Sequence, residues 1–409
     1  MRTVLLRLSG FALLPLLSLI TPLLLLPIVS GVVGGQGVSS VISGQAIGTF
    51  AATLLVWGWN VDGPVAVARA NSDPERAEIY SQSMRTRLLL LVVVLPATVI
   101  VSVLVSVPGF GADAAWMGVA TSLAGLSPAW FGIGLGRPRL LALYDTLPRF
   151  VGTVVAAPLI LLTGSLWPYA TTMAVVMLVN LILFHRRYSP GERWLPLVFR
   201  ETLRDLGTQA RTAGINLTGS AYASTPAPIA TATSTPLASG SLATADTLYR
   251  FGIFSVIALG NAFQSWTIET GAESRHRRHL AAIAAHAVLG LAGLVIITML
   301  GPLASSILFA GKAQATTTLC FYYGVAFFFL SASTPLIRNL LIPAARQSLI
   351  LRWTTISAII GLAAMLVAGI TAHTTLIPLG MAASEAILCG ALLGPALRCL
   401  RSERMVHGE

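Results

Sequence analysis

The sequence predicts an all-α integral membrane protein with about 12 transmembrane helices. These form two six-helix halves related by a pseudo-twofold axis along the membrane normal. Three observations support this class. The 409-residue chain is 55% hydrophobic and only 10% charged, whereas a soluble domain carries about 25% charged residues. Twelve apolar segments recur along the chain, and the Lys and Arg residues gather in alternate connections between them.

Each apolar segment approaches the roughly 20 residues that a helix needs to cross a bilayer. The segments are residues 11–33, 38–59, 88–107, 114–135, 147–164, 167–184, 213–237, 242–268, 280–303, 316–336, 349–370 and 376–397. The first one follows Arg2 and Arg7 like a signal peptide, but it is too long for a typical signal-peptide core. We therefore expect an uncleaved first span.

The cations predict the orientation. All but two of the 26 Lys and Arg residues fall on one side if the segments span in turn, and the exceptions are Arg250 and Lys312. Cytoplasmic connections retain Lys and Arg. Both termini and the long connections, 60–87 and 185–211, are therefore expected in the cytoplasm. We expect a multi-pass protein of the bacterial cytoplasmic (inner) membrane.

The seventh segment, residues 213–237, is rich in Ala, Ser, Thr and Pro. By itself it is also typical of a flexible linker. Its removal would reverse the side of every later cation, so we interpret it as a helix that faces a wet cavity or other helices. The halves then cover residues 1–205 and 206–409, a plan that is common in transporters with a site between the halves.

Motifs for chemistry are absent from the sequence. It contains no phosphate-binding loop, no HExxH and no Gly-x-Ser-x-Gly, and its three cysteines have no metal spacing. We therefore predict no enzyme activity, no catalytic residue, no metal and no cofactor. The net charge of +11 indicates contact with anionic lipid headgroups and not with nucleic acid, because the arginines lie in short loops between apolar segments.

Charged side chains inside apolar segments are the strongest site candidates, because they are costly in lipid. Asp246 and Arg250 are four residues apart and share one helix face. We predict that they bind substrate, with a local ion pair or snorkelling of Arg250 as alternatives. Glu385 is the only acid well inside a segment, and it is the candidate for ion coupling, with a packing role as the alternative.

Four further polar residues are candidates for substrate binding. Arg149 opens the fifth segment and Asn60 follows the second, so both also suit the membrane interface. Gln45 and Gln264 lie within segments. Either of them could serve as a hydrogen-bonding contact between helices instead.

Several stretches carry a family resemblance. They are SGQAIGTFAATLLVWGWNVDGPVAVARA, LSPAWFGIGLGRPRLLALYDTLPRF with Arg149, GSLATADTLYRFGIFSVIALGNAFQS with Asp246 and Arg250, and PLGMAASEAIL with Glu385. The chain resembles the Wzx-type polysaccharide (O-antigen) flippases, which share the MOP superfamily with MATE drug exporters and MurJ-type lipid II flippases.

The resemblance implies a role in polysaccharide biosynthesis. The expected activity is movement of an undecaprenyl-diphosphate-linked oligosaccharide between leaflets by alternating access. The expected partners are that glycan lipid, membrane lipids, a glycan polymerase and glycosyltransferases. A cation-coupled small-molecule exporter of the MATE kind is the main alternative. A membrane-embedded glycan polymerase or ligase fits less well, because no external connection is long enough for a catalytic domain. A scaffold also fits less well, because it would not need paired six-helix halves.

Overall fold

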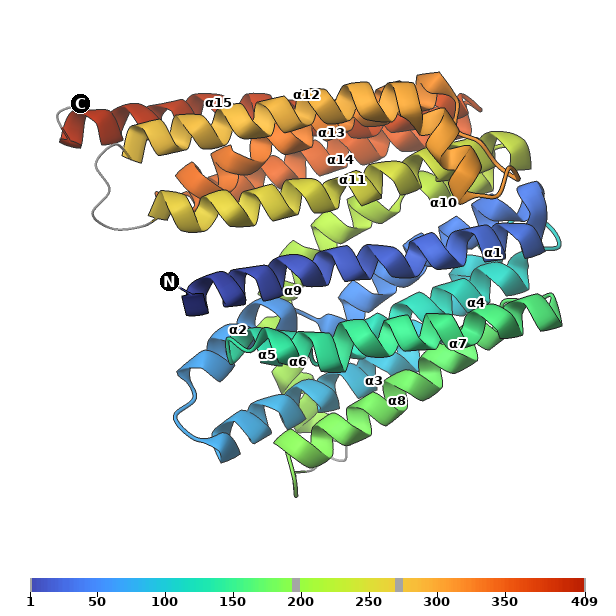
Figure 1. Cartoon of the computed structure of the whole chain (residues 1–409), viewed down its shortest axis with the longest axis horizontal. Helices are drawn as coiled ribbons and strands as arrows, with labels where there is room; N and C mark the ends of the chain where they lie inside the picture. Colours follow the sequence, from blue (N-terminus) through green and yellow to red (C-terminus); the bar gives the residue numbers. More distant parts are fainter. Residues whose placement is uncertain (1, 193–198, 269–274, 408–409) are drawn as a thin grey trace. The chain divides into compact units, whose positions relative to one another are not determined.

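The structure, a computed structural model, describes residues 2–192, 199–268 and 275–407, and all regular secondary structure in these ranges is helical (Figure 1). The chain divides into two compact units, Met1–Ala232 and Thr233–Glu409, called the first and second unit below. Residues 206–232 thus pack within the first unit. The symmetric six-helix halves, 1–205 and 206–409, stay a prediction.

The first unit contains twelve helical elements. They are α1 (Arg2–Val56), α2 (Trp59–Arg69), α3 (Asp73–Val105), α4 (Gly111–Ser122), the 3-10 helix η1 (Leu123–Leu126), α5 (Ala129–Gly134), α6 (Pro138–Leu141), the π-helix η2 (Ala142–Thr146), α7 (Leu147–Thr163), α8 (Trp167–Tyr188), α9 (Phe199–Ser224) and α10 (Pro226–Thr233).

The second unit is built from longer helices. They are α11 (Pro236–Ile268), α12 (Arg275–Leu308), α13 (Thr317–Pro335), the π-helix η3 (Leu336–Leu341), α14 (Gln347–Ile370), the 3-10 helix η4 (Thr374–Leu376) and α15 (Ile377–His407).

Among the described residues, nine helices are long and apolar enough to cross a membrane. The twelve predicted segments are helical, and three differences explain the lower number. α1 contains the first two segments, joined at a kink where Gly34 leaves helical geometry with φ 65°. Segment 114–135 is broken at Ser127 and Pro128, and the hydroxyl-rich segment 213–237 is broken at Thr225 and again before Pro236. Proline explains these breaks, because it lacks the backbone N–H that a helix needs.

The long connections are more ordered than predicted. Residues 60–87 were expected as a cytoplasmic loop, but α2 and the start of α3 occupy most of that range. α3 begins where the Ser72 hydroxyl accepts a hydrogen bond from the Glu75 backbone N–H at 3.3 Å, and Pro74 lies in its first turn. A serine cap followed by Pro and Glu stabilises a helix start. The loop is therefore limited to the few residues between α2 and α3.

Glycine allows close helix packing in the first unit. A Cβ atom added to Gly44 of α1 would lie 2.1 Å from the Ala114 carbonyl oxygen of α4, and one added to Gly48 would lie 2.4 Å from that of Gly118. The backbones of α1 and α4 therefore touch. Small residues at such spacing are the usual way in which membrane helices approach each other.

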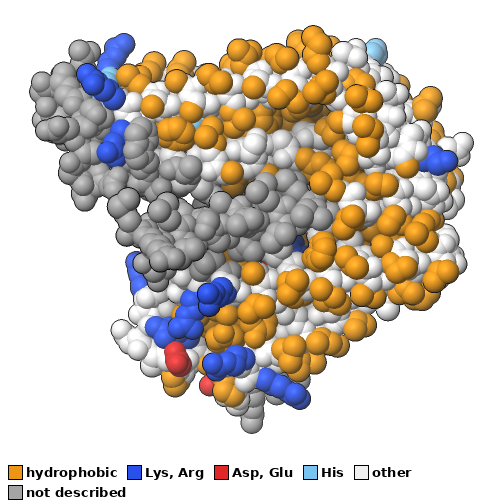
Figure 2. Space-filling model, viewed as in Figure 1, with side chains coloured by type: hydrophobic (Ala, Val, Ile, Leu, Met, Phe, Trp, Pro, Cys, Tyr) orange, Lys and Arg blue, Asp and Glu red, His pale blue; other side chains and the backbone are white. Residues whose placement is uncertain are grey.

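The outer surfaces of the helices carry apolar side chains. Leu162 on α7 is 83% exposed and Leu104 on α3 is 77% exposed, while Met299 on α12 in the second unit is 73% exposed. Figure 2 shows hydrophobic side chains along the helices, with the arginines of the first unit gathered toward one end of them. Exposed apolar surface of this extent requires a lipid environment. The chain is a multi-pass membrane protein, as predicted.

Candidate functional site

The structure joins Asp246 and Arg250 on α11. The Arg250 Nε donates to the Asp246 Oδ2 at 2.6 Å. The Asp246 side chain is completely buried, while that of Arg250 is 30% exposed. A helix with 3.6 residues per turn places positions four apart on one face, so the predicted pair forms without help from another helix. The Arg250 side chain is thus only partly enclosed, whereas its carboxylate partner is fully enclosed.

Two tyrosines surround this ion pair. The ring of Tyr249 lies 5.4 Å from the ring of Tyr323 on α13, and both residues are almost fully buried. The Tyr323 phenol interacts electrostatically with Asp246, although neither its hydroxyl nor the Asp246 Oδ1 meets hydrogen-bond geometry within the described residues. Within the described residues, the buried carboxylate has its short hydrogen bond from Arg250 and a further electrostatic contact with the Tyr323 phenol.

Arg149 forms a second ion pair, in the first unit. Its Nη2 donates to the Asp145 Oδ2, and the pair has 36% and 14% exposed side chains, respectively. The other carboxylate oxygen of Asp145 accepts from the Ser127 hydroxyl at 2.6 Å. Asp145 belongs to η2 and Arg149 to α7, and their spacing of four residues along this continuous helical stretch places both groups on one face. Arg149 is thus held in place, and it is not a freely mobile interface residue.

Arg87, the last residue of the predicted connection 60–87, is a functional candidate that the sequence analysis missed. Its side chain is fully buried in α3. Nη1 donates to the Ser127 carbonyl at 2.9 Å, and the guanidinium lies 5.5 Å from the centre of the Trp130 ring. Within the described residues, its Nε and Nη2 have no hydrogen-bond partner.

Arg87, Ser127, Asp145 and Arg149 form one polar network. Ser127 connects its members, because its carbonyl accepts from Arg87 and its hydroxyl donates to Asp145. This network contains two arginines and one carboxylate, and only Arg149 bonds to that carboxylate directly. A sequence signal for Arg87 exists: Tyr80, Met84 and Arg87 follow helical spacing on α3, and all three are 0% exposed.

Asn60 contacts the hydroxyl-rich segment. Its side-chain oxygen accepts from the Asn216 amide of α9 at 3.0 Å. Further along the same seam, Thr53 bonds to Ser220 at 2.9 Å and Ser43 bonds to Thr231 at 2.6 Å. The segment is therefore a pair of helices, α9 and α10, which pack against α1 through hydroxyl groups. The interpretation as a helix that faces other helices is supported over the flexible linker.

The remaining candidates have fewer contacts. Gln45 is half-buried on α1, and its backbone carbonyl accepts from the Thr49 hydroxyl at 2.8 Å. Gln264 belongs to α11, but its side chain lies outside the described residues. Glu385 on α15 is 7% exposed. Its Oε2 has no hydrogen-bond partner within the part of the chain that the structure describes.

The sequence matches no protein-family profile, and no curated protein matches it. Solved structures do match. The lipid II flippase MurJ in an inward closed conformation has a TM-score of 0.69 at 10% identity, covering 96% of this chain and 87% of that chain. The eukaryotic MATE transporter AtDTX14 has a TM-score of 0.52 at 13% identity, covering 98% of both chains.

A MATE transporter in complex with MaL6 has a TM-score of 0.53 at 14% identity, covering 98% of this chain and 96% of that chain. At these identities the likeness concerns the fold alone. It agrees with the composition, the apolar helices and the exposed apolar surfaces described above. The chain is an all-helical, multi-pass membrane protein with the fold of the MurJ and MATE transporters.

Proposed function

We propose that this protein is a flippase for an undecaprenyl-diphosphate-linked oligosaccharide in the bacterial cytoplasmic membrane. The observation that carries the proposal is the Asp246–Arg250 pair, an arginine held by a fully buried carboxylate within an apolar helix. An arginine costs about 2.5–3.5 kcal/mol at the centre of a membrane helix even on the lower scales. A requirement to bind an anion accounts for such a costly residue.

Transport of this lipid needs a polar path. Polar groups that lose their hydrogen bonds to water cost several kcal/mol each in hydrocarbon, so a diphosphate and its sugars do not cross unaided. A guanidinium binds phosphate oxygens through two charge-assisted hydrogen bonds. Arg250 would exchange the Asp246 carboxylate for the incoming diphosphate, and Arg149, Asn60, Gln45 and Gln264 would bind other polar parts of the substrate.

Several features of the proposal follow from the sequence. The alternation of cation-rich connections supports cytoplasmic termini. Alternating access between the halves 1–205 and 206–409 would move the headgroup while the polyprenyl tail stays in lipid. The glycosyltransferases that build the glycan and the polymerase that extends it are the proposed partners. No reaction is assigned to the protein itself.

A cation-coupled small-molecule exporter is the second candidate. Glu385 favours it, because a buried carboxyl group with an oxygen that makes no hydrogen bond in the described residues is suited to exchange a proton or bind a cation. The same residue could couple the flippase to an ion gradient. A direct test of the transported substrate therefore separates the two candidates.

Deletion of the gene followed by lipid extraction separates the two candidates. The flippase proposal predicts that undecaprenyl-diphosphate-linked glycan accumulates in spheroplasts and stays inaccessible to a glycosidase added outside. Complementation by the wild-type chain should restore access. Unchanged levels and sidedness of the glycan lipid, together with increased sensitivity to cationic drugs, would contradict the flippase and favour the exporter.

A further inference from the structure

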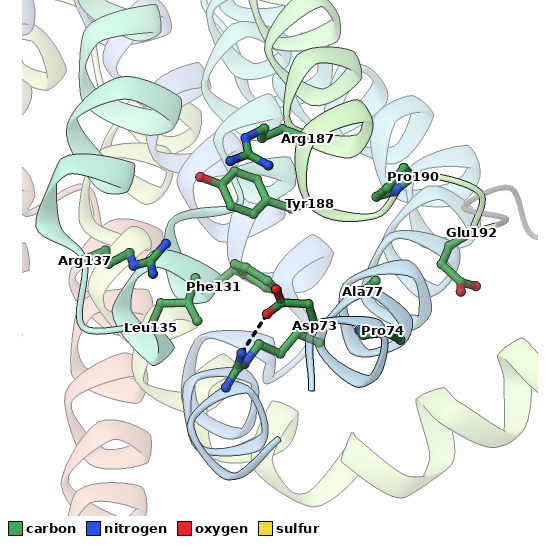
Figure 3. A pocket seen from close by; sticks show the side chains of 11 residues that line it. Asp73, Pro74, Ala77, Phe131, Leu135, Arg137, Arg187, Tyr188, Pro190 and Glu192 are labelled. Carbon is green, nitrogen blue, oxygen red and sulfur yellow. Dashed lines mark hydrogen bonds and ion pairs between the residues drawn. The ribbon is translucent and has the colours of Figure 1, made fainter. Parts of the chain in front are cut away.

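The first unit contains a cationic pocket that the proposed transport site does not use. Its volume is about 400 Å³, and it lies where the start of α3, the α5–α6 connection and the end of α8 meet (Figure 3). Arg76, Arg137 and Arg187 line it together with Tyr188 and Phe131. In Figure 3, the Tyr188 ring lies next to Arg187, and Arg137 lies to the left of both.

Positive charge is in excess in this pocket. Arg76 donates to Asp73 at 2.8 Å. Arg137 and Arg187 are both exposed, and neither forms an ion pair within the described ranges of the chain. Glu192 also lines the pocket, but Figure 3 shows its carboxylate on the side away from these two arginines. Two arginine side chains are thus available to an anion.

An apolar groove lies along the same helix, α8. It has a volume of about 390 Å³ and runs between η2 and α7 on one side and α8 on the other. Its α8 wall includes Val175, Val179 and Leu183, which are 50–55% exposed. The ring of Tyr144, which lines the groove, lies 6.1 Å from the ring of Tyr188, which lines the pocket.

Groove and pocket are linked along α8. Val175, Val179, Leu183 and Arg187 are spaced four residues apart, so they form one inclined stripe, which turns by about 40° around the helix at each step. The apolar part of the stripe, from Val175 to Leu183, is about 12 Å long at 1.5 Å per residue. One leaflet of the hydrocarbon core is about 15 Å deep. The stripe therefore provides an apolar surface that fits within one leaflet, with Arg187 at its end.

We propose that this composite site binds an anionic glycerophospholipid of the leaflet at that end of the helices, the cytoplasmic leaflet in the proposed orientation. One acyl chain lies in the groove, and the phosphate contacts Arg137 and Arg187. The depth of the groove fits an acyl chain of one leaflet better than a longer polyprenyl chain. Basic residues near a membrane surface attract anionic lipids, and the fixed groove adds selectivity for a lipid over a soluble phosphate.

Lipid titration by native mass spectrometry tests the proposal on the full chain in detergent, without any transport step. The ligands are dioleoyl phosphatidylglycerol and dioleoyl phosphatidylcholine, which differ in headgroup charge but not in acyl chains. We expect the wild-type chain to bind phosphatidylglycerol about 25-fold more tightly, at about 5-fold per arginine. Equal affinity for the two lipids would overturn the proposal. Because only lipid binding is measured, a failed flippase assignment would leave this result unaffected.

Variants locate the binding. Arg137→Gln combined with Arg187→Gln should reduce the preference to about 2-fold or less, whereas Arg139→Gln, an exposed arginine outside the pocket, should retain it. Val179→Trp should fill the groove and weaken the binding of both lipids about 10-fold. Val154→Trp is its control on the exposed face of α7. Wild-type preference in the double arginine variant would overturn the proposal.

Competition identifies the source of the phosphate. Undecaprenyl phosphate at a concentration equal to that of phosphatidylglycerol should leave most of the phosphatidylglycerol bound, and millimolar inorganic phosphate should displace little of it. Full displacement by undecaprenyl phosphate would assign the site to the polyprenyl carrier instead. Full displacement by inorganic phosphate would assign it to a soluble anion. Either result would overturn the assignment to a bilayer phospholipid.

Discussion

The Asp246–Arg250 ion pair of α11 can be neutralised at either residue alone or at both together. Comparing these variants separates a structural role of the pair from a role in substrate binding. The variants are Arg250→Gln, Asp246→Asn and the double variant. Each replacement keeps a hydrogen-bonding side chain and removes one charge. Asp246 is the fully buried member and Arg250 is 30% exposed, so the two single variants are not equivalent.

The expected losses of stability follow from the different burial of the two side chains. Arg250→Gln leaves the buried Asp246 carboxylate without its 2.6 Å partner, and removal of one side of a buried ion pair costs about 3–5 kcal/mol. Asp246→Asn leaves an arginine that still reaches the surface, so we expect the loss of one charged hydrogen bond, about 1.5–3 kcal/mol. The double variant has no buried charge and should lie within about 1–2 kcal/mol of wild type.

Export should respond differently from stability. Thermal unfolding in detergent and the amount of protein in the membrane should fall for Arg250→Gln and recover in the double variant. Glycan export should stay at least about 10-fold below wild type in both, because a charge-assisted hydrogen bond to the substrate contributes roughly 1.5–3 kcal/mol. Arg250→Lys should restore export only in part, since an ammonium group does not bind phosphate bidentately.

The double variant provides the refutation. Normal surface glycan in a strain that carries Asp246→Asn with Arg250→Gln would mean that the pair serves only to place α11 in the membrane. The substrate role of Arg250 would then be abandoned. Loss of membrane protein in Arg250→Gln alone would not decide the question, because the buried carboxylate accounts for it.

Three further predictions concern other parts of the chain. Arg87→Met should change the free energy of unfolding by less than about 2 kcal/mol, because buried charges can often be replaced by apolar side chains without loss of stability. A decrease of more than about 4 kcal/mol, measured by thermal unfolding, would mean that the Arg87 network stabilises the first unit. Gly44→Ala should lower the free energy of unfolding by about 1–3 kcal/mol, because the added Cβ would lie 2.1 Å from the Ala114 carbonyl oxygen. Gly31→Ala is the control, since a Cβ there has nothing within 4 Å. Equal melting temperatures for the two variants would contradict this packing. Glu385→Gln should lower export at unchanged membrane levels if transport is coupled to a cation, and full complementation would leave Glu385 as a packing residue.

The local features of the chain could be predicted from the sequence. Apolar segment length predicts membrane helices because the bilayer admits only backbones that satisfy their own hydrogen bonds. The Asp246–Arg250 bond was predictable for a similar reason, since helical geometry alone places positions four apart on one face. Helicity of residues 213–237 followed from the charge pattern, although their composition resembles a linker.

Features that depend on distant residues could not be predicted. Arg87 stands at the edge of an apolar segment like the other loop arginines, and its burial depends on Trp130 and the Ser127 carbonyl, which lie on the α5 side of the first unit. The Ser127 hydroxyl that donates to Asp145 comes from a distant part of the chain, and the groove beside α8 needs η2, α7 and α8 together. Spacing along a chain fixes which residues share a helix face, whereas the partners of that face depend on side-chain packing between helices. The membrane class and the pair within α11 thus follow from the amino-acid order, whereas packing between helices sets which arginines are buried, which are paired and which remain available to a ligand.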